Sequence, residues 1–187
     1  MSPDTSSFMV PDAVVSHFHI KDGDVVADFG TGSGHFLKAL AIRVGVGKVY
    51  ACEIQKALVE KISDQVRATG LHNVFPLWCD LEEPDGLKIK SGDLDVGILV
   101  NTLFQLEDKA TAVKEMGRTI RSGGRLMLID WTDSFGGLGP QQDQVIVAKE
   151  ATALCESLGF VLEQDFPAGG HHYGLAFRKL WNYGPSN

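Results

Sequence analysis

Short apolar segments alternate with amphipathic segments along the chain, and this alternation limits the fold more than any other feature of the sequence. The apolar segments, such as 25–29 and 94–100, have the length of strands. From Ile54 to Val66, apolar residues recur every four positions, which is the spacing of one face of a helix. Strands that alternate with helices form a parallel sheet covered on both faces. The sequence therefore predicts an α/β fold.

The closing part of the chain departs from this alternation. No helical segment separates the strands predicted at 160–164 and 172–178, so these two strands must be antiparallel neighbours. The chain contains no internal repeat, low-complexity tract or interdomain linker, and we therefore predict a single domain over residues 1–187. The other strands are predicted at 25–29, 48–53, 74–79, 94–100 and 125–130, and helices at about 36–43, 54–66, 109–120 and 143–158.

Charge and composition argue against several classes of protein. Lysine and arginine number 17 against 24 aspartates and glutamates, and the basic residues are scattered, which disfavours nonspecific binding to nucleic acid. The longest strongly apolar run, 96–100, is far shorter than the ~20 residues that span a bilayer. Three cysteines are too few for a disulfide framework or a zinc site. Because the N-terminus also lacks a secretory signal pattern, we predict a cytoplasmic protein with no membrane span.

A glycine-rich loop follows the first predicted strand, in the sequence Gly30-Thr31-Gly32-Ser33-Gly34. Glycines allow the backbone to turn tightly and let a ligand approach where a Cβ atom would collide. A dinucleotide-binding fingerprint requires glycine or alanine at the sixth position, which is His35 here. Asp28, at the end of the strand, would repel a pyrophosphate but would favour a ligand that carries an ammonium and a sulfonium. S-adenosylmethionine is such a ligand.

Polar side chains also follow the next three predicted strands. Glu53 ends the second strand, where a carboxylate can accept hydrogen bonds from both hydroxyls of a ribose, and we expect it to lie at an exposed strand end. Asp80 ends the third strand and can accept from an adenine amine, while Leu81 can cover the ring. Asn101 follows the fourth strand, at the point where such sheets bind ligands. The recurrence of these groups at successive strand ends predicts a binding site for a nucleoside.

These segments resemble the class I S-adenosylmethionine-dependent methyltransferases over nearly the whole chain. The resemblance implies a doubly wound, Rossmann-like sheet of seven strands in the order 3-2-1-4-5-7-6, with the last strand antiparallel. Within the class, the chain is similar to the small-molecule methyltransferases grouped with the quinone-biosynthesis C-methyltransferases. The matching segments are ADFGTGSGHF (27–36), VYACEI (49–54), WCDLE (78–82), LDVGILVNTLFQL (94–106) and RSGGRLMLIDW (121–131). The cofactor-binding residues expected on these grounds are Asp28, Gly30, Thr31, Gly32, Ser33, Gly34, Glu53, Ile54, Asp80, Leu81 and Asn101.

The acceptor of the methyl group leaves no clear signature. The run Asn101-Thr102-Leu103-Phe104 lacks the Asn/Asp-Pro-Pro-Tyr pattern of enzymes that methylate exocyclic amines. Asp130 could serve as one ligand of a catalytic metal, but the sequence offers no second carboxylate at position 101. Adjacent side chains on a strand point to opposite faces, so His171 and His172 could not share an ion. We expect no metal and identify no catalytic residue; Cys52, Cys79 and Cys155 are predicted to be buried and nonreactive.

The sequence therefore predicts an enzyme that uses S-adenosylmethionine to methylate a small-molecule acceptor by direct displacement. Two alternatives remain open: methylation of RNA or protein, and binding of S-adenosylmethionine without catalysis. No nucleic-acid partner is expected, and the protein is predicted to be a monomer or a homodimer.

Overall fold

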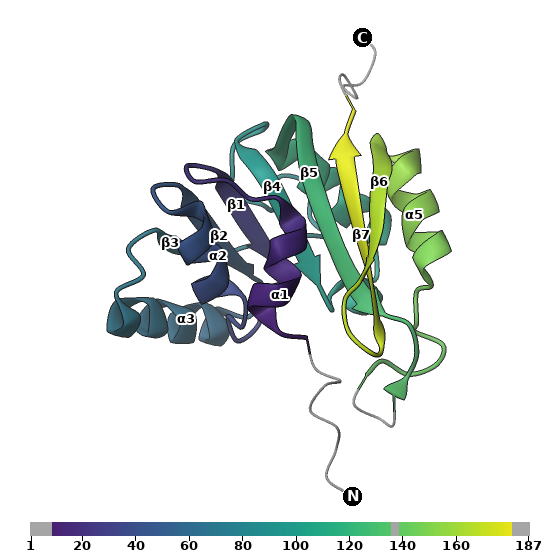
Figure 1. Ribbon diagram of the computed structural model, residues 1–187, viewed down its shortest axis with the longest axis horizontal. Coiled ribbons are helices and arrows are strands. Elements are labelled where there is room, and N and C mark those ends of the chain that lie inside the picture. The colour runs from purple at the N-terminus through teal and green to yellow at the C-terminus, as the bar shows by residue number, and fades with distance from the viewer. Residues whose placement is uncertain (1–8, 136–138, 181–187) are drawn as a thin grey trace, which may run out of the picture.

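The computed structural model describes residues 9–135 and 139–180. Within these residues, one sheet of seven strands has the order β3-β2-β1-β4-β5-β7-β6 (Figure 1). Strand β7 runs antiparallel to both β5 and β6, and the remaining neighbours are parallel, so the predicted topology is confirmed. The strands are β1 (Val25–Phe29), β2 (Lys48–Glu53), β3 (Val74–Trp78), β4 (Leu94–Val100), β5 (Ile120–Trp131), β6 (Phe160–Pro167) and β7 (His172–Lys179).

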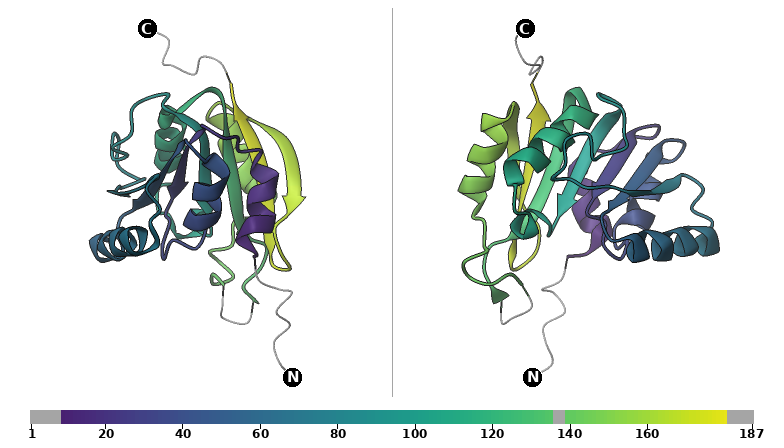
Figure 2. Two further views of the ribbon diagram at one scale, coloured as in Figure 1. Left: turned by 60° about the vertical axis from the view of Figure 1, so that its left-hand side comes forward. Right: turned by 180° about the vertical axis from the view of Figure 1, so that it is seen from behind.

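Helices cover both faces of this sheet (Figure 2). Helices α1 and α2 pack on one face together with the short helix η2, and α4 and α5 pack on the other. No described helix is both long enough and apolar enough to cross a membrane. The helices are α1 (Pro11–Val15), η2 (Ser16–Phe18), α2 (Leu37–Val44), α3 (Lys56–Thr69), η3 (Leu103–Gln105), α4 (Lys109–Thr119) and α5 (Ala148–Ser157).

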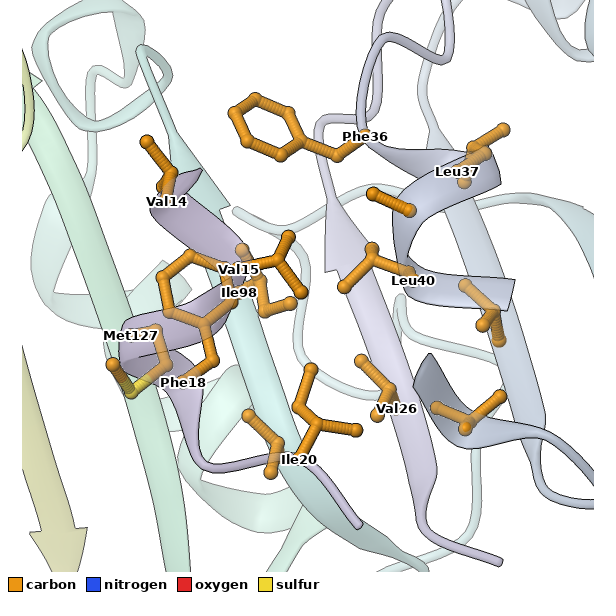
Figure 3. Packing of buried hydrophobic residues seen from close by; sticks show 14 of the residues in the cluster. Val14, Val15, Phe18, Ile20, Val26, Phe36, Leu37, Leu40, Ile98 and Met127 are labelled. Carbon is orange, nitrogen blue, oxygen red and sulfur yellow. The ribbon is translucent and has the colours of Figure 1, made fainter. Parts of the chain in front are cut away.

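The apolar strands contribute side chains to two separate hydrophobic cores, one on each face of the sheet. Along β5, Met127 and Ile129 belong to the first core, and Leu126 and Leu128 belong to the second. This division arises because consecutive side chains of a strand point to opposite faces. Phe18 of η2 is fully buried in the first core, where it lies near Met127 (Figure 3). The near-continuous apolar character of the central strands is therefore explained by burial on both faces.

Several predicted boundaries differ from the structure by one to three residues, and two differ by five. Strand β5 begins at Ile120 rather than residue 125, because the predicted Ser122-Gly123-Gly124 turn is an irregularity inside the strand: Leu94 pairs with Ile120, and Val96 pairs with Arg125. Helix α5 begins at Ala148 rather than at 143, because the preceding polar residues form a turn in which Gln144 N–H donates to Gln141 O.

Gly70 ends α3 as the sequence pattern predicts. Its φ is +67°, and its N–H donates to Val66 O. A Cβ at this position would approach only the His72 ring, at 3.8 Å, so an added methyl group meets no obstacle and the left-handed backbone alone disfavours a side chain. We expect Gly70→Ala to lower the free energy of unfolding by about 1–2 kcal/mol in chemical denaturation. Gly70→Asn should lose less, because asparagine tolerates this conformation; equal losses would contradict the backbone explanation.

Candidate active site

A pocket of about 270 Å³ opens at the carboxyl ends of β1, β2 and β3 and extends to the segment after β4. Six of the predicted residues line it: Gly30, Gly32, Glu53, Ile54, Asp80 and Leu81. The other five, Asp28, Thr31, Ser33, Gly34 and Asn101, are not among the residues that line this pocket. The sequence did not single out the remaining lining residues, which are Cys52, Gln55, Leu58, Cys79, Glu82, Thr102, Gln105 and Leu106.

Gly30 allows the glycine loop to lie against the segment that follows β4. Its φ is +68°, and a Cβ built on it would lie 2.7 Å from Thr102 Oγ1. Thr102 Oγ1 in turn donates to Val100 O at 2.9 Å. Gly32 differs, because no atom lies within 4 Å of the place where its Cβ would be. The loop is therefore tightly packed at Gly30 and open at Gly32, where its backbone faces free space.

Glu53 fastens the glycine loop to the end of β2. Its Oε2 accepts from Gly32 N–H at 3.0 Å, and its Oε1 accepts from Gln55 N–H at 2.9 Å. The residue is only 6% exposed, so the expectation of an exposed strand-end carboxylate is wrong. The hydrogen bonds from these two backbone N–H groups compensate for the loss of water around the buried carboxylate. Each carboxylate oxygen can accept a further hydrogen bond, so Glu53 can still receive hydroxyl donors from a ligand in the pocket.

The far side of the pocket combines a carboxylate with apolar side chains. Asp80 follows β3, and its Oδ1 accepts from Glu82 N–H at 3.0 Å, which shapes the turn. Leu81 is buried, and Leu58 of α3 and Leu106 complete an apolar wall. A flat ring in this place would meet apolar side chains and have Asp80 available as an acceptor at its edge.

Asp28 lies beneath the glycine loop rather than on the pocket wall. It is 3% exposed, and its Oδ2 accepts from Thr31 Oγ1 at 2.6 Å. Burial, which disfavours the charged form, raises the pKa of Asp28 to about 7; the Thr31 hydrogen bond opposes this shift, and the charge of Glu53 adds to it. Asp28 therefore has an environment in which it titrates near neutral pH.

Asn101 and Asp130 lie at the adjacent ends of β4 and β5. Asn101 has φ +52°, and among the described residues its buried Oδ1 has no hydrogen-bond partner. Asp130 is 1% exposed and accepts from the N–H groups of Phe104 and Trp131, at 3.2 and 2.8 Å. Burial raises the pKa of Asp130 to about 6, although these hydrogen bonds oppose the shift. Asp130 thus connects the end of β5 to the helix η3 that follows β4.

The three cysteines are buried, as predicted, and none forms a disulfide. Cys52 and Cys79 nevertheless contribute to the lining of the pocket, which the sequence pattern did not reveal. Their positions could have indicated this, because Cys52 lies near the end of β2, Cys79 directly follows β3, and these two strands are neighbours in the sheet. In residues 9–135 and 139–180, no group of three histidine, cysteine or acidic side chains is arranged to hold a metal ion.

Aromatic and histidine side chains gather where β5 ends and β7 begins. Trp131 pairs with His172 across these strands, with their ring centroids 4.2 Å apart. Phe135 stacks on His171, whose Nδ1 lies 2.9 Å from Asp133 Oδ2. The two adjacent histidines therefore contact different partners, and His171 lies in the turn before β7 rather than on the strand itself.

Comparison with known proteins shows the family to which this chain belongs. A family model described as a methyltransferase domain matches residues 27–128, more than half of the chain. The chain is 26% identical over 114 residues to the ubiquinone/menaquinone biosynthesis C-methyltransferase UbiE of Hydrogenovibrio crunogenus, a match that covers 60% of this chain and 44% of that protein. It is 28% identical over 120 residues to the protein of the same name from Burkholderia mallei, covering 63% and 47%. The chain thus spans about half the length of these relatives.

A solved structure of similar size gives a fuller match. A SAM-dependent methyltransferase from Aquifex aeolicus has a TM-score of 0.86 and 26% identity, with 96% of this chain and 94% of that chain covered. The chain therefore belongs to the methyltransferase domain family, as one of the class I S-adenosylmethionine-dependent methyltransferases, and S-adenosylmethionine is its cofactor. The pocket fits this cofactor, because the backbone at Gly32 faces free space and Glu53 retains acceptor capacity beside it.

Proposed function

We propose that this protein transfers the methyl group of S-adenosylmethionine to a small-molecule acceptor, and that one domain carries out the whole reaction. The observation that carries the proposal is the pocket itself, in which Glu53, held by two backbone N–H groups, lies between an open glycine loop and an apolar wall. The names of the relatives from Hydrogenovibrio and Burkholderia support a small-molecule acceptor. The net charge of −7 disfavours RNA as the acceptor.

The residues of the pocket have distinct roles in this proposal. Glu53 accepts hydrogen bonds from the ribose hydroxyls, and Asp80 and Leu81 receive the adenine ring, one at its edge and one against its face. The backbone from Gly30 to Gly34 lies along the methionine part of the cofactor, and Asp28 beneath it provides a negative charge toward the cofactor's ammonium group. When bound, S-adenosylmethionine supplies an electrophilic methyl group. The protein contributes orientation of this group and exclusion of water, both of which promote direct displacement.

Selectivity for the cofactor can be tested by calorimetric titration with S-adenosylhomocysteine and with NAD. We expect S-adenosylhomocysteine to bind and NAD not to bind, because Asp28 would repel a pyrophosphate and His35 replaces the small residue of a dinucleotide fingerprint. Tighter binding of NAD than of S-adenosylhomocysteine would contradict the proposed roles of these residues.

The acceptor class can be tested with S-adenosylmethionine that carries a labelled methyl group. The purified protein is incubated with separate small-molecule, RNA and protein fractions of a bacterial extract, and the label is located by mass spectrometry. We expect a labelled product in the small-molecule fraction. Label in RNA or protein would overturn the small-molecule assignment, and cofactor binding without label in any fraction would favour binding without catalysis.

A further inference from the structure

A histidine and an aspartate that lie 38 residues apart in the sequence meet where β5 ends and β7 begins. His171 Nδ1 lies 2.9 Å from Asp133 Oδ2 and 3.1 Å from Oδ1. The ring of Phe135 stacks on the imidazole at a centroid distance of 3.7 Å, and Thr132 N–H donates to His171 O at 2.9 Å. The imidazole is thus fixed by its backbone, by its face and by one ring nitrogen.

The pairing with Asp133 determines which nitrogen of His171 carries a proton. The hydrogen bond from His171 lowers the pKa of Asp133, so this carboxylate is ionised and can only accept. Nδ1 therefore donates, and in the neutral imidazole the lone pair is on Nε2. The His171 side chain is 26% exposed, so it is neither sealed in the core nor free in solvent.

Strand register places this pair at the same end of the sheet as the pocket, although neither residue lines the pocket. Thr102, which lines the pocket, follows β4; Asn101 N–H donates to Ile129 O of β5; and Trp131 of β5 pairs with His172 of β7. Two strand spacings of about 4.8 Å separate β4 from β7, so the start of β7 lies about 10 Å to the side of the end of β4, near which Thr102 lines the pocket. Figure 1 shows the end of β5 and the turn between β6 and β7 at the same edge of the sheet.

We propose that His171 is the general base of the methyl transfer and that Asp133 is its positioning residue. This inference rests on the proposed function and names the class of acceptor: a small molecule whose reacting atom carries a proton, such as a hydroxyl group. The acceptor's electron pair forms the new bond to the methyl carbon while the carbon–sulfur bond breaks and its electrons remain on sulfur. The acceptor's proton moves to Nε2, and the resulting imidazolium is stabilised by Asp133 until it releases the proton to solvent.

Neighbouring titratable groups are less suited to this role. Both ring nitrogens of His172 are buried and, among the described residues, lack hydrogen-bond partners. Burial lowers the pKa of His172 to about 4, and its ring lies against Trp131. Asp130 is 1% exposed and already accepts from two backbone N–H groups. Of these groups, His171 alone combines partial exposure with an oriented lone pair.

The base is tested by His171→Asn, because the asparagine amide can still donate to Asp133 but offers no basic nitrogen at the Nε2 position. The assay uses methyl-labelled S-adenosylmethionine and the small-molecule fraction described above, and follows the wild-type product. We expect the rate of product formation to fall by about 100- to 10,000-fold, the usual contribution of a general base. Binding of S-adenosylhomocysteine should be unchanged. His72→Asn, at an exposed histidine between α3 and β3, is the matched control and should retain the wild-type rate.

The positioning role is tested without turnover, by ¹⁵N NMR of the histidines in the complex with S-adenosylhomocysteine. We expect neutral His171 to carry its proton on Nδ1 in the wild type, and Asp133→Asn to shift it toward Nε2. In the labelling assay, Asp133→Asn should lower kcat with little change in KM. A neutral wild-type His171 protonated on Nε2 would overturn the inference, whatever the activity.

The outcomes separate this inference from the proposed function. If the wild type yields a labelled small molecule and His171→Asn yields it at the same rate, the base assignment is wrong and the function stands. If the wild type labels no small molecule although it binds S-adenosylhomocysteine, the proposed function fails, and the base assignment fails with it.

Discussion

Replacing Glu53 with alanine is expected to weaken the binding of S-adenosylhomocysteine by about 10- to 150-fold. Hydrogen bonds to a charged group contribute roughly 1.5–3 kcal/mol, and each 1.4 kcal/mol corresponds to a factor of ten. The protein without ligand should also lose about 1–3 kcal/mol of unfolding free energy, because Gly32 N–H and Gln55 N–H lose their acceptor. Calorimetric titration and chemical denaturation measure the two effects.

Glu60→Ala is the matched control for this prediction, since Glu60 is an exposed glutamate on α3. We expect its affinity to be unchanged and its stability to change by no more than about 0.5 kcal/mol. A Glu53→Ala protein that binds S-adenosylhomocysteine as tightly as the wild type would exclude the proposed contact with the ribose. A loss of stability without loss of affinity would make Glu53 a purely structural residue that fastens the glycine loop.

The stability of the ligand-free protein is expected to fall as the pH rises toward and through about 7, and Asp28 is expected to be a main cause. Its pKa is about 7 in the folded protein, raised by burial from 3.8, so the folded state binds more protons than the unfolded state between these values. The contribution of Asp28 is therefore fully present below pH 3.8 and lost as the pH rises through its folded pKa. Between about pH 5 and about pH 8 the loss amounts to about 3 kcal/mol.

Asp28→Asn tests this prediction, because asparagine can accept the hydrogen bond of Thr31 without titrating. In denaturation experiments at both pH values, the variant should lack most of the decrease that the wild type shows. Asp80→Asn is the matched control, since it changes the same kind of side chain at a partly exposed strand end, and it should preserve the wild-type decrease. Equal decreases in the wild type and in Asp28→Asn would contradict the raised pKa.

Most of the fold could be predicted from sequence because its signals are local. The period of the apolar residues distinguished strands from helices, and the absence of a helix between 160–164 and 172–178 required an antiparallel pair. The errors occurred where local patterns are weak. The polar residues that precede Val147 continue no helical stripe, and the irregularity around Gly123 is defined by its pairing with β4, which the sequence of that segment does not contain.

The part of the candidate site that lies at the ends of strands could be predicted from the sequence. Gly30, Glu53 and Asp80 follow consecutive parallel strands, and such ends meet at one edge of a sheet, so their convergence followed from topology. Gln105 and Leu106 escaped prediction because they lie at the end of η3, and the path of this segment depends on contacts such as the one from Phe104 N–H to Asp130. The exposure expected for Glu53 was wrong because backbone donors from two segments, at Gly32 and Gln55, surround it.

The sequence by itself determined the order of strands and helices, the glycine loop and the class of cofactor, since each depends on residues close together in the chain. Only the tertiary structure brought His171 to Asp133. Only the tertiary structure revealed how Arg118 connects α4 to the segment before β4, by donating to Glu115, Leu87 O and Ile89 O. Apart from the local pair of Arg118 and Glu115, these contacts are decided by the packing of segments 29 to 38 residues apart, and no local periodicity encodes which side chains meet when the sheet closes.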